Sequence, residues 1–144
     1  MSFTLTNTSL VGVGTDAISS IEAAVLIGGP GNNVINTTGF TGATLVQSDR
    51  GRDRVLGGSG PDLFFGGPGT DYLSGGKGPD ILVGGRDRDS LGGAAKDRLS
   101  GGRGSDILSG GSGKDRLSGN QGVDICRGTI GTDIFRSCEL IRAA

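Results

Sequence analysis

The sequence predicts an all-β fold, a parallel β-roll (a β-solenoid) in which two nonapeptide repeats form each coil. Three observations lead to this prediction: aspartate recurs every nine residues, an apolar residue lies two places after each aspartate, and glycine is in excess. Glycine supplies 31 of the 144 residues, roughly three times its usual ~7% share. Because apolar residues make up only 33% of the chain, we do not expect a thick core of large side chains.

Aspartate sets the period. Residues 57–65 form the first clean unit, which opens with two glycines, has a third glycine at its fourth place and carries aspartate at its sixth. A fixed short period is typical of a solenoid, in which each repeat packs only against its neighbours. Every step between aspartates is nine residues, except that Asp89 to Asp97 is eight. The register contains Asp53, Asp62, Asp71, Asp80, Asp89, Asp97, Asp106, Asp115, Asp124 and Asp133.

The eighth place of each unit is apolar, and the residues around it alternate as in a short strand with one buried side chain. The Gly-Gly-x-Gly portion is not expected inside a strand, because glycine weakens strands and favours turns with positive φ. Each unit is therefore predicted to form a six-residue turn and a three-residue strand. The eighth-place residues are Val55, Phe64, Leu73, Leu82, Leu91, Leu99, Leu108, Leu117, Cys126 and Phe135.

The register weakens before Asp53. Residues 11–19 and 28–36 still fit it, with Ile18 at the buried place of the first unit and Asn33 at the aspartate place of the second. Terminal repeats of solenoids are expected to be atypical. We therefore expect degenerate repeats and a cap of the same solenoid in residues 1–47, the repeat β-roll in residues 48–136, and a C-terminal tail in residues 137–144.

The repeated turns have the chemistry of a calcium site. Ca²⁺ takes six to eight oxygen ligands and accepts backbone carbonyls as well as carboxylates. Glycine turns can direct several carbonyls toward one point because no Cβ obstructs them. With two repeats per coil, one edge of the solenoid is expected to carry Asp53, Asp71, Asp89, Asp106 and Asp124, and the other Asp62, Asp80, Asp97, Asp115 and Asp133. Stacked carboxylates repel each other without a cation, so metal binding and folding are expected to be coupled.

The predicted ligands are the side chains of these ten aspartates and the backbone of the turn glycines, which together would hold several Ca²⁺ ions. The glycines are Gly57, Gly58, Gly60, Gly66, Gly67, Gly69, Gly75, Gly76, Gly78, Gly101, Gly102, Gly104, Gly110, Gly111 and Gly113. Two neighbouring units depart from the pattern. Residues 84–91 form a unit of eight with Asp87 at the fourth place, and residues 92–100 have Ala95 there. Because alanine is strained in left-handed conformations, sites that use these turns are expected to be weak or missing.

Basic residues nearly balance the acidic ones, with 14 against 15. Arg52 and Arg54 bracket Asp53, and Asp97 and Asp115 are bracketed by basic residues in the same way. These side chains either pair with the carboxylates and weaken calcium binding, or point into solvent; we favour the second interpretation. Since each bound Ca²⁺ adds two charges, the loaded form would be cationic, which indicates an anionic cell-surface polymer as a partner.

The units resemble the hemolysin-type calcium-binding (RTX) nonapeptide repeats, strongly over residues 48–136 and weakly over residues 11–36. The resemblance implies a parallel β-roll with calcium in its turns and a secreted, extracellular bacterial protein. Its role would be structural, as an adhesin-like or exoprotein module, with a neighbouring domain of a larger protein as another possible partner. Cys126 and Cys138 lie close together near the end of the chain, which favours a local disulfide like the one that closes some members of the family.

Catalysis is not expected, because histidine is absent and no Gly-x-x-x-x-Gly-Lys-Ser/Thr motif is present to bind phosphate. A metal-free structural β-solenoid that acts as a surface interaction module is the alternative function. The carboxylates in its turns argue against that alternative, since a metal-free solenoid does not need them. The start of the chain lacks the features of a signal peptide, and no apolar run approaches the ~20 residues of a membrane span. We expect no nucleic-acid partner.

Overall fold

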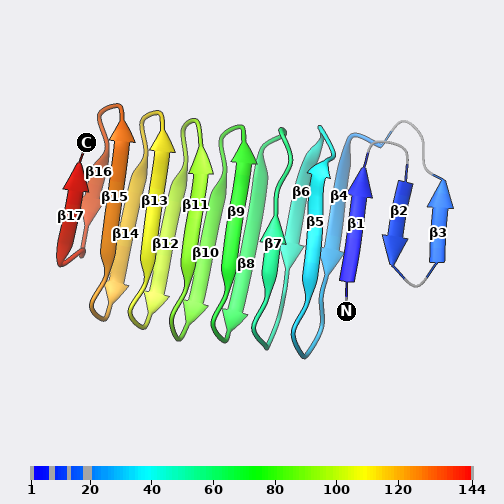
Figure 1. The fold of residues 1–144 in the computed structure, drawn as a ribbon, viewed down its shortest axis with the longest axis horizontal. Helices are drawn as coiled ribbons and strands as arrows, with labels where there is room; N and C mark the ends of the chain where they lie inside the picture. The colour runs from blue at the N-terminus through cyan, green and yellow to red at the C-terminus, as the bar shows by residue number, and fades with distance from the viewer. Residues whose placement is uncertain (1, 7–8, 13, 18–20, 144) are drawn as a thin grey trace.

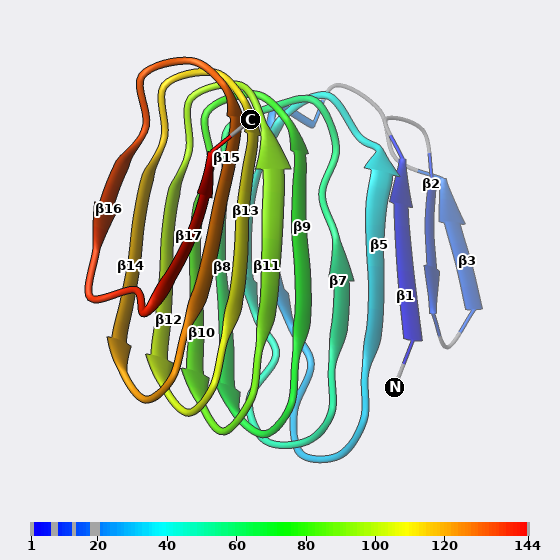
Figure 2. The ribbon, with the colours of Figure 1, turned by 60° about the vertical axis from the view of Figure 1, so that its left-hand side comes forward.

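The computed structural model describes residues 2–6, 9–12, 14–17 and 21–143, and every regular element in these ranges is a β-strand. The strands form two sheets that face each other across a flattened coil (Figures 1 and 2). Sheet A has ten strands, in the spatial order β17 (Leu140–Ala143), β15 (Ile125–Ile130), β13 (Ile107–Ser112), β11 (Ser90–Ala94), β9 (Tyr72–Lys77), β7 (Arg54–Leu56), β5 (Val34–Gly39), β1 (Ser2–Thr6), β2 (Ser9–Gly12) and β3 (Gly14–Ala17). Sheet B has seven, in the order β16 (Ile134–Arg136), β14 (Arg116–Gln121), β12 (Arg98–Arg103), β10 (Ile81–Arg86), β8 (Asp62–Pro68), β6 (Ala43–Gln47) and β4 (Ala23–Ile27).

From β4 onward, consecutive strands alternate between the two sheets, and each pairs in parallel with the strand one coil away. Tyr72 on β9, for example, pairs with Arg54 on β7 and with Ser90 on β11. The same register continues through sheet B, where Leu82 pairs with Phe64 and with Leu99. The structure therefore confirms the predicted parallel β-roll with two repeats per coil.

The core is a thin double row of side chains between the sheets. Among the residues at the eighth place, all but Phe135 are at most 2% exposed, and Phe135 packs against the row while partly buried. Each of them stacks on the equivalent side chain of the next coil, because the parallel register places like residues side by side. Ile35 and Val46 extend the two rows toward the N-terminus.

The predicted strand length is wrong. Strands in the regular part of the coil span six or seven residues rather than three, and they include the first two glycines of the following unit. Gly85 at the end of β10, for example, pairs in register with Gly67 and Gly102. Successive coils have the same backbone shape, so the bend at the glycine pair repeats and its hydrogen bonds to the neighbouring coils are kept.

Residues 28–36 fit the register as expected, since Asn33 and Ile35 are buried at the aspartate and apolar places. The prediction that residues 11–19 form a similar unit is wrong. Strands β2 and β3 pair antiparallel, with Gly12 opposite Gly14, so the chain reverses as a hairpin instead of continuing the coil. Ile18 lies outside the described residues. Strand β1 joins this hairpin to the roll, because it pairs antiparallel with β2 and parallel with β5.

At the other end, Cys126 on β15 and Cys138 form the expected disulfide, with their Cα atoms 5.9 Å apart. Strand β17 then pairs in parallel with β15 and adds the last strand to sheet A, inside the segment expected to be a tail. The division of the chain into three segments stays a prediction. Among the described residues, no helix could cross a membrane.

Candidate metal centre

The aspartates form two ladders along the long edges of the roll. We call edge A the series Asn33, Asp53, Asp71, Asp89, Asp106 and Asp124, and edge B the series Thr44, Asp62, Asp80, Asp97, Asp115 and Asp133. In each series, the backbone N–H of one member donates to the carboxylate Oδ1 of the member one coil further on, at 2.8–3.0 Å. The structure thus brings the predicted carboxylates together in the two sets expected from the period.

The second carboxylate oxygen is buried without a hydrogen-bond partner in most of these residues. This Oδ2 is orphaned in Asp53, Asp71, Asp80, Asp89, Asp97, Asp106, Asp115 and Asp124, whose side chains are at most 2% exposed. Asp62 differs, because its Oδ2 accepts a hydrogen bond from the Gly58 N–H at 3.2 Å. Orphaned buried oxygens are rare in folded proteins and call for an explanation such as an ion.

Except in the unit of Asp53, which begins with Ser48, the first glycine of the unit leaves the space into which this oxygen points. A Cβ on Gly66 would lie 2.5 Å from Asp71 Oδ2, and a Cβ on Gly75 would lie 2.1 Å from Asp80 Oδ2. A side chain at this place would therefore fill the cradle beside the carboxylate. The same glycine is also needed for the stacking of coils, since the Cβ on Gly66 would lie 2.6 Å from the Gly84 carbonyl oxygen.

Burial raises the pKa of the ladder aspartates. Loss of water around the carboxylates is the main cause, and the charge of the neighbouring rungs adds to it. The pKa rises to about 6 for Asp71 and Asp97, about 7 for Asp80 and about 8 for Asp89. It is also raised for Asp53, Asp62, Asp106 and Asp115. A divalent cation bound to these carboxylates would lower their pKa again, because it stabilises the ionised form.

The turn of Asn33 shows which other oxygens face the same point. The Asn33 side-chain amide N–H groups donate to the carbonyl oxygens of Gly29 at 2.8 Å and Gly31 at 2.6 Å. The same nitrogen lies 3.3 Å from the Ser48 carbonyl oxygen and 3.2 Å from Asp53 Oδ1, both in the next coil. The side-chain atom at the place of Oδ2 in a turn therefore faces two carbonyls of its own turn, and a carbonyl and a carboxylate of the next.

This donor set suits calcium, which accepts a mixture of carboxylate and carbonyl oxygens. Within the described residues, no three side chains of aspartate, glutamate, cysteine or histidine gather closely enough to hold a metal alone. A metal in these turns would therefore need backbone carbonyls as ligands, as the sequence predicts. The second and fourth places of the turn, which would supply them, include glycines in the left-handed region, such as Gly67 with φ 104° and Gly69 with φ 136°.

In the irregular stretch, the structure shows that the unit one residue short is not the one that the sequence predicts. Gly92 pairs with Ser74 and Ser109, which are ninth-place residues, so the unit beginning at Gly84 has nine residues and not eight. The next unit is the short one. Its Gly93 occupies the first place, where a Cβ would lie 2.2 Å from Asp97 Oδ2. The residue is missing from the turn rather than from the strand, because loss from the strand would turn its buried face outward.

The two unusual fourth-place residues adopt the turn conformation despite their side chains. Asp87 has φ 75° and Ala95 has φ 95°, both in the left-handed region. Aspartate tolerates this region better than alanine does. The strain predicted for Ala95 is therefore present, whereas the expected weakness of calcium sites at these turns stays a prediction.

Replacing Ala95 with glycine is expected to stabilise the calcium-loaded chain by about 1 kcal/mol, because glycine adopts this φ without steric strain. The control is Ala94→Gly, one residue away at the end of β11, where φ is not positive. There glycine only adds freedom to the unfolded chain and is expected to destabilise the fold. Urea unfolding in saturating calcium measures both changes, and equal destabilisation by both variants would contradict the assignment of strain to Ala95.

The basic residues beside the aspartates point outward. Arg52, Arg54, Lys96 and Arg98 are exposed, while the aspartates between them are buried. Arg54 lies over the Tyr72 ring, 5.1 Å from its centroid, rather than on a carboxylate. The structure therefore supports the interpretation that these side chains are solvated. The acidic charge of the roll is concentrated inside it and the basic charge on its surface, and an anionic polymer stays the predicted partner.

Comparison with known families agrees with this geometry. A profile of the RTX calcium-binding nonapeptide repeat matches residues 38–73, 47–82, 65–95, 74–107 and 91–126, which together span more than half of the chain. The chain belongs to this family. It is an RTX calcium-binding repeat β-roll, and the resemblance seen in its sequence is confirmed. Searches of curated proteins and of solved structures give no match.

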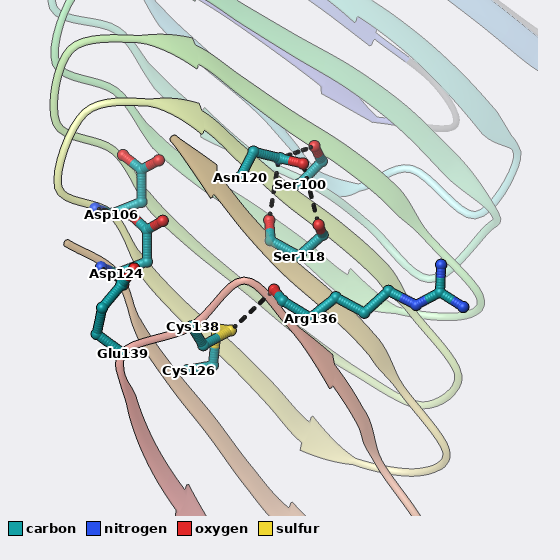
Figure 3. Close-up of a disulfide and its surroundings, with 9 residues drawn as sticks. All are labelled: Ser100, Asp106, Ser118, Asn120, Asp124, Cys126, Arg136, Cys138 and Glu139. Carbon is teal, nitrogen blue, oxygen red and sulfur yellow. Dashed lines mark hydrogen bonds between the residues drawn. A yellow bond between two sulfur atoms is a disulfide. The ribbon is translucent and has the colours of Figure 1, made fainter. Parts of the chain in front are cut away.

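Two residues at the ends of the RTX ladders, Thr44 and Glu139, were not predicted as part of them, whereas Asn33 was expected at the aspartate place of its unit. Asn33 and Thr44 begin edges A and B, and both hydrogen-bond to a ladder carboxylate, Thr44 through its backbone N–H and its hydroxyl. Glu139 ends edge A, because its carboxylate accepts the Asp124 N–H (Figure 3). A signal for Glu139 existed: it is followed by Leu140 and Ile141, as Asp124 is followed by Ile125 and Cys126.

Proposed function

We propose that this chain is a secreted structural module that folds when calcium binds in its turns, with the ten ladder aspartates and the turn glycine carbonyls as the ligands. The observation that carries the proposal is the row of buried carboxylate oxygens without partners. The internal amide of Asn33 supports the assignment of the carbonyl ligands, because its nitrogen takes the place of the unpaired Oδ2 of the other turns and is surrounded by carbonyl oxygens.

The energetic argument compares two magnitudes. Taking an ionised carboxylate out of water costs several kcal/mol, and the one backbone N–H that each ladder Oδ1 accepts offsets only about 1.5–3 kcal/mol of it. A whole domain is stable by only ~5–15 kcal/mol. Eight such carboxylates in one roll exceed that margin, so the ionised, metal-free chain is not expected to remain folded. Calcium offsets the charge at the same points, and folding and binding therefore become one event.

Far-UV circular dichroism during a calcium titration tests the proposal. The purified chain in chelator at pH 8 is expected to show little β signal and to gain it cooperatively as calcium is added. Magnesium is the control, because it requires small octahedral sites with several waters and is a poor fit for a cage of carbonyls. A spectrum that is fully β-rich in chelator and unchanged by calcium would instead favour the metal-free structural solenoid.

A further inference from the structure

The C-terminal end of edge A continues past the last repeat. The Asp124 N–H donates to the Glu139 carboxylate, as the Asp106 N–H donates to Asp124 one coil earlier. Strand β17 begins directly after Glu139, as β15 begins directly after Asp124. Figure 3 shows Asp106, Asp124 and Glu139 in one line along this edge. Glu139 therefore occupies a rung of the ladder, although it lies outside the nine-residue register.

Asp124 directs an unused oxygen into the space between these rungs. Its side chain is fully buried, and its Oδ2 has no hydrogen-bond partner. The space is open because Gly119 has no side chain: a Cβ there would lie 2.3 Å from Asp124 Oδ2 and 2.2 Å from the Ser137 carbonyl oxygen. A carboxylate and a carbonyl from two successive coils thus face the same point.

The Asn33 turn at the opposite end of edge A identifies the remaining oxygens. Its amide meets the carbonyls four and two residues before it, a carbonyl of the next coil and the carboxylate of the next rung. In the last turn the equivalent groups are the carbonyls of Asn120 and Gly122, the Ser137 carbonyl and the Glu139 carboxylate. Asn120 and Gly122 have φ 75° and 138°, so this turn has the left-handed backbone of the others.

We propose that Asp124, Glu139 and these three carbonyls form a further calcium site that closes edge A at its C-terminal end. This inference rests on the proposed function of the ladders. The site has five protein oxygens and two negative charges, which match a divalent cation but fall short of the six to eight ligands that calcium takes. Because Glu139 is exposed, solvent can supply the rest, and the site is expected to be weaker than those inside the roll.

The disulfide explains how a short connection can deliver this ligand. Cys138 directly precedes Glu139, and Cys126 is fully buried two residues after Asp124. The Cys126–Cys138 bond fixes the chain just before Glu139 against the coil that carries Asp124 (Figure 3). In the regular coils, the six residues of a Gly-Gly-x-Gly-x-Asp turn separate the ninth place of one unit from the seventh place of the next. Here only residues 137–139 separate Arg136 from Leu140, which is too few for such a turn. Glu139 is therefore positioned by the disulfide.

The test is the calcium stoichiometry of the full chain with Glu139→Gln, measured by isothermal titration calorimetry. The variant keeps the size of the side chain and removes its charge. It is expected to bind one ion fewer than the wild type, with the remaining ions and the β signal in saturating calcium unchanged. Glu22→Gln, at an exposed position near the N-terminus, is the matched control and is expected to retain every ion.

Two outcomes would overturn the inference: Glu139→Gln retains the full number of ions, or it loses several ions together with its β signal. The second would make Glu139 a structural cap rather than a ligand of one site. Failure of the proposed function itself gives a different result, because the wild type would then bind no calcium in the same titration. Reduction of the disulfide in the wild type gives an independent check. It is expected to lower the affinity for one calcium ion and to leave the others bound.

Discussion

In the presence of a calcium chelator, the β signal of the chain is expected to be strongest near pH 5 and to fall as the pH rises toward 8. In the fold, the pKa lies at about 6 for Asp71 and Asp97, about 7 for Asp80 and about 8 for Asp89, whereas an unperturbed aspartate ionises near 3.8. Between these values the folded chain holds protons that the unfolded chain has released. Stability therefore decreases as the pH rises across this window.

The direction is opposite to that of ordinary acid denaturation, in which paired carboxylates lose their partners as they are protonated. Here the protonated aspartates replace the missing cation, because a neutral carboxyl can be buried at lower cost than an ionised one. Far-UV circular dichroism from pH 4 to pH 9 in chelator measures the effect. A metal-free chain that is folded at pH 8 and unfolds toward pH 5 would show that the buried carboxylates are not the source of its instability.

The same titration in saturating calcium is the control. Calcium and protons compete for the same oxygens, so the affinity for calcium is expected to increase with pH over the window in which the metal-free fold weakens. The β signal should then remain nearly constant at neutral and alkaline pH. A calcium affinity that does not change between pH 5 and pH 8 would indicate that the ion binds away from the ladder aspartates.

The sequence was sufficient to predict the features that depend on a strict period. Each aspartate and each eighth-place apolar residue takes the same position as its equivalent one coil away, so the two edges and the core rows follow from counting nine residues. The length of the strands did not follow, because glycine propensity argued against strand. In the coil, Gly85 is held between Gly67 and Gly102, and stacking of identical turns outweighs the preference of an isolated residue.

The features that were missed lie where the period fails. Glu139 comes six residues after Asp133, so counting places it in the tail, and only the strand pairing of β17 shows that it is a rung. The missing residue near Ala95 could be assigned to either of two units, since Gly92 can be read as the ninth residue of one unit or as the first residue of the next. Strand pairing decides between them through Gly92. The N-terminal hairpin of β2 and β3 was missed for a related reason, because a glycine spacing alone does not distinguish a reversal from a coil.

Substituting asparagine for one central aspartate is expected to remove two calcium ions rather than one. Asp89 Oδ1 accepts the Asp71 N–H at 2.8 Å, at the previous turn of edge A. Its Oδ2 points into its own turn, where a Cβ on Gly84 would lie 2.4 Å away. The Asp89 carboxylate therefore faces two predicted calcium sites, the one in its own turn and the one in the turn of Asp71, and Asp89→Asn removes a charge from both. Asp133 ends edge B and faces one complete cage, so Asp133→Asn is the matched control and should lose one ion.

Asp89→Asn is also expected to gain β signal in chelator at pH 8, while its further gain on addition of calcium decreases. The pKa of Asp89 is raised to about 8 by burial and by the charges of Asp71 and Asp106, and asparagine removes that repulsion. Asn33 shows that this chain can fill a cage with an amide, whose N–H groups donate to the turn carbonyls. Calorimetry counts the ions, and circular dichroism in chelator measures the fold. If Asp89→Asn loses no more ions than Asp133→Asn and is no better folded without calcium, then the carboxylates do not bridge successive turns, and each turn binds its ion alone.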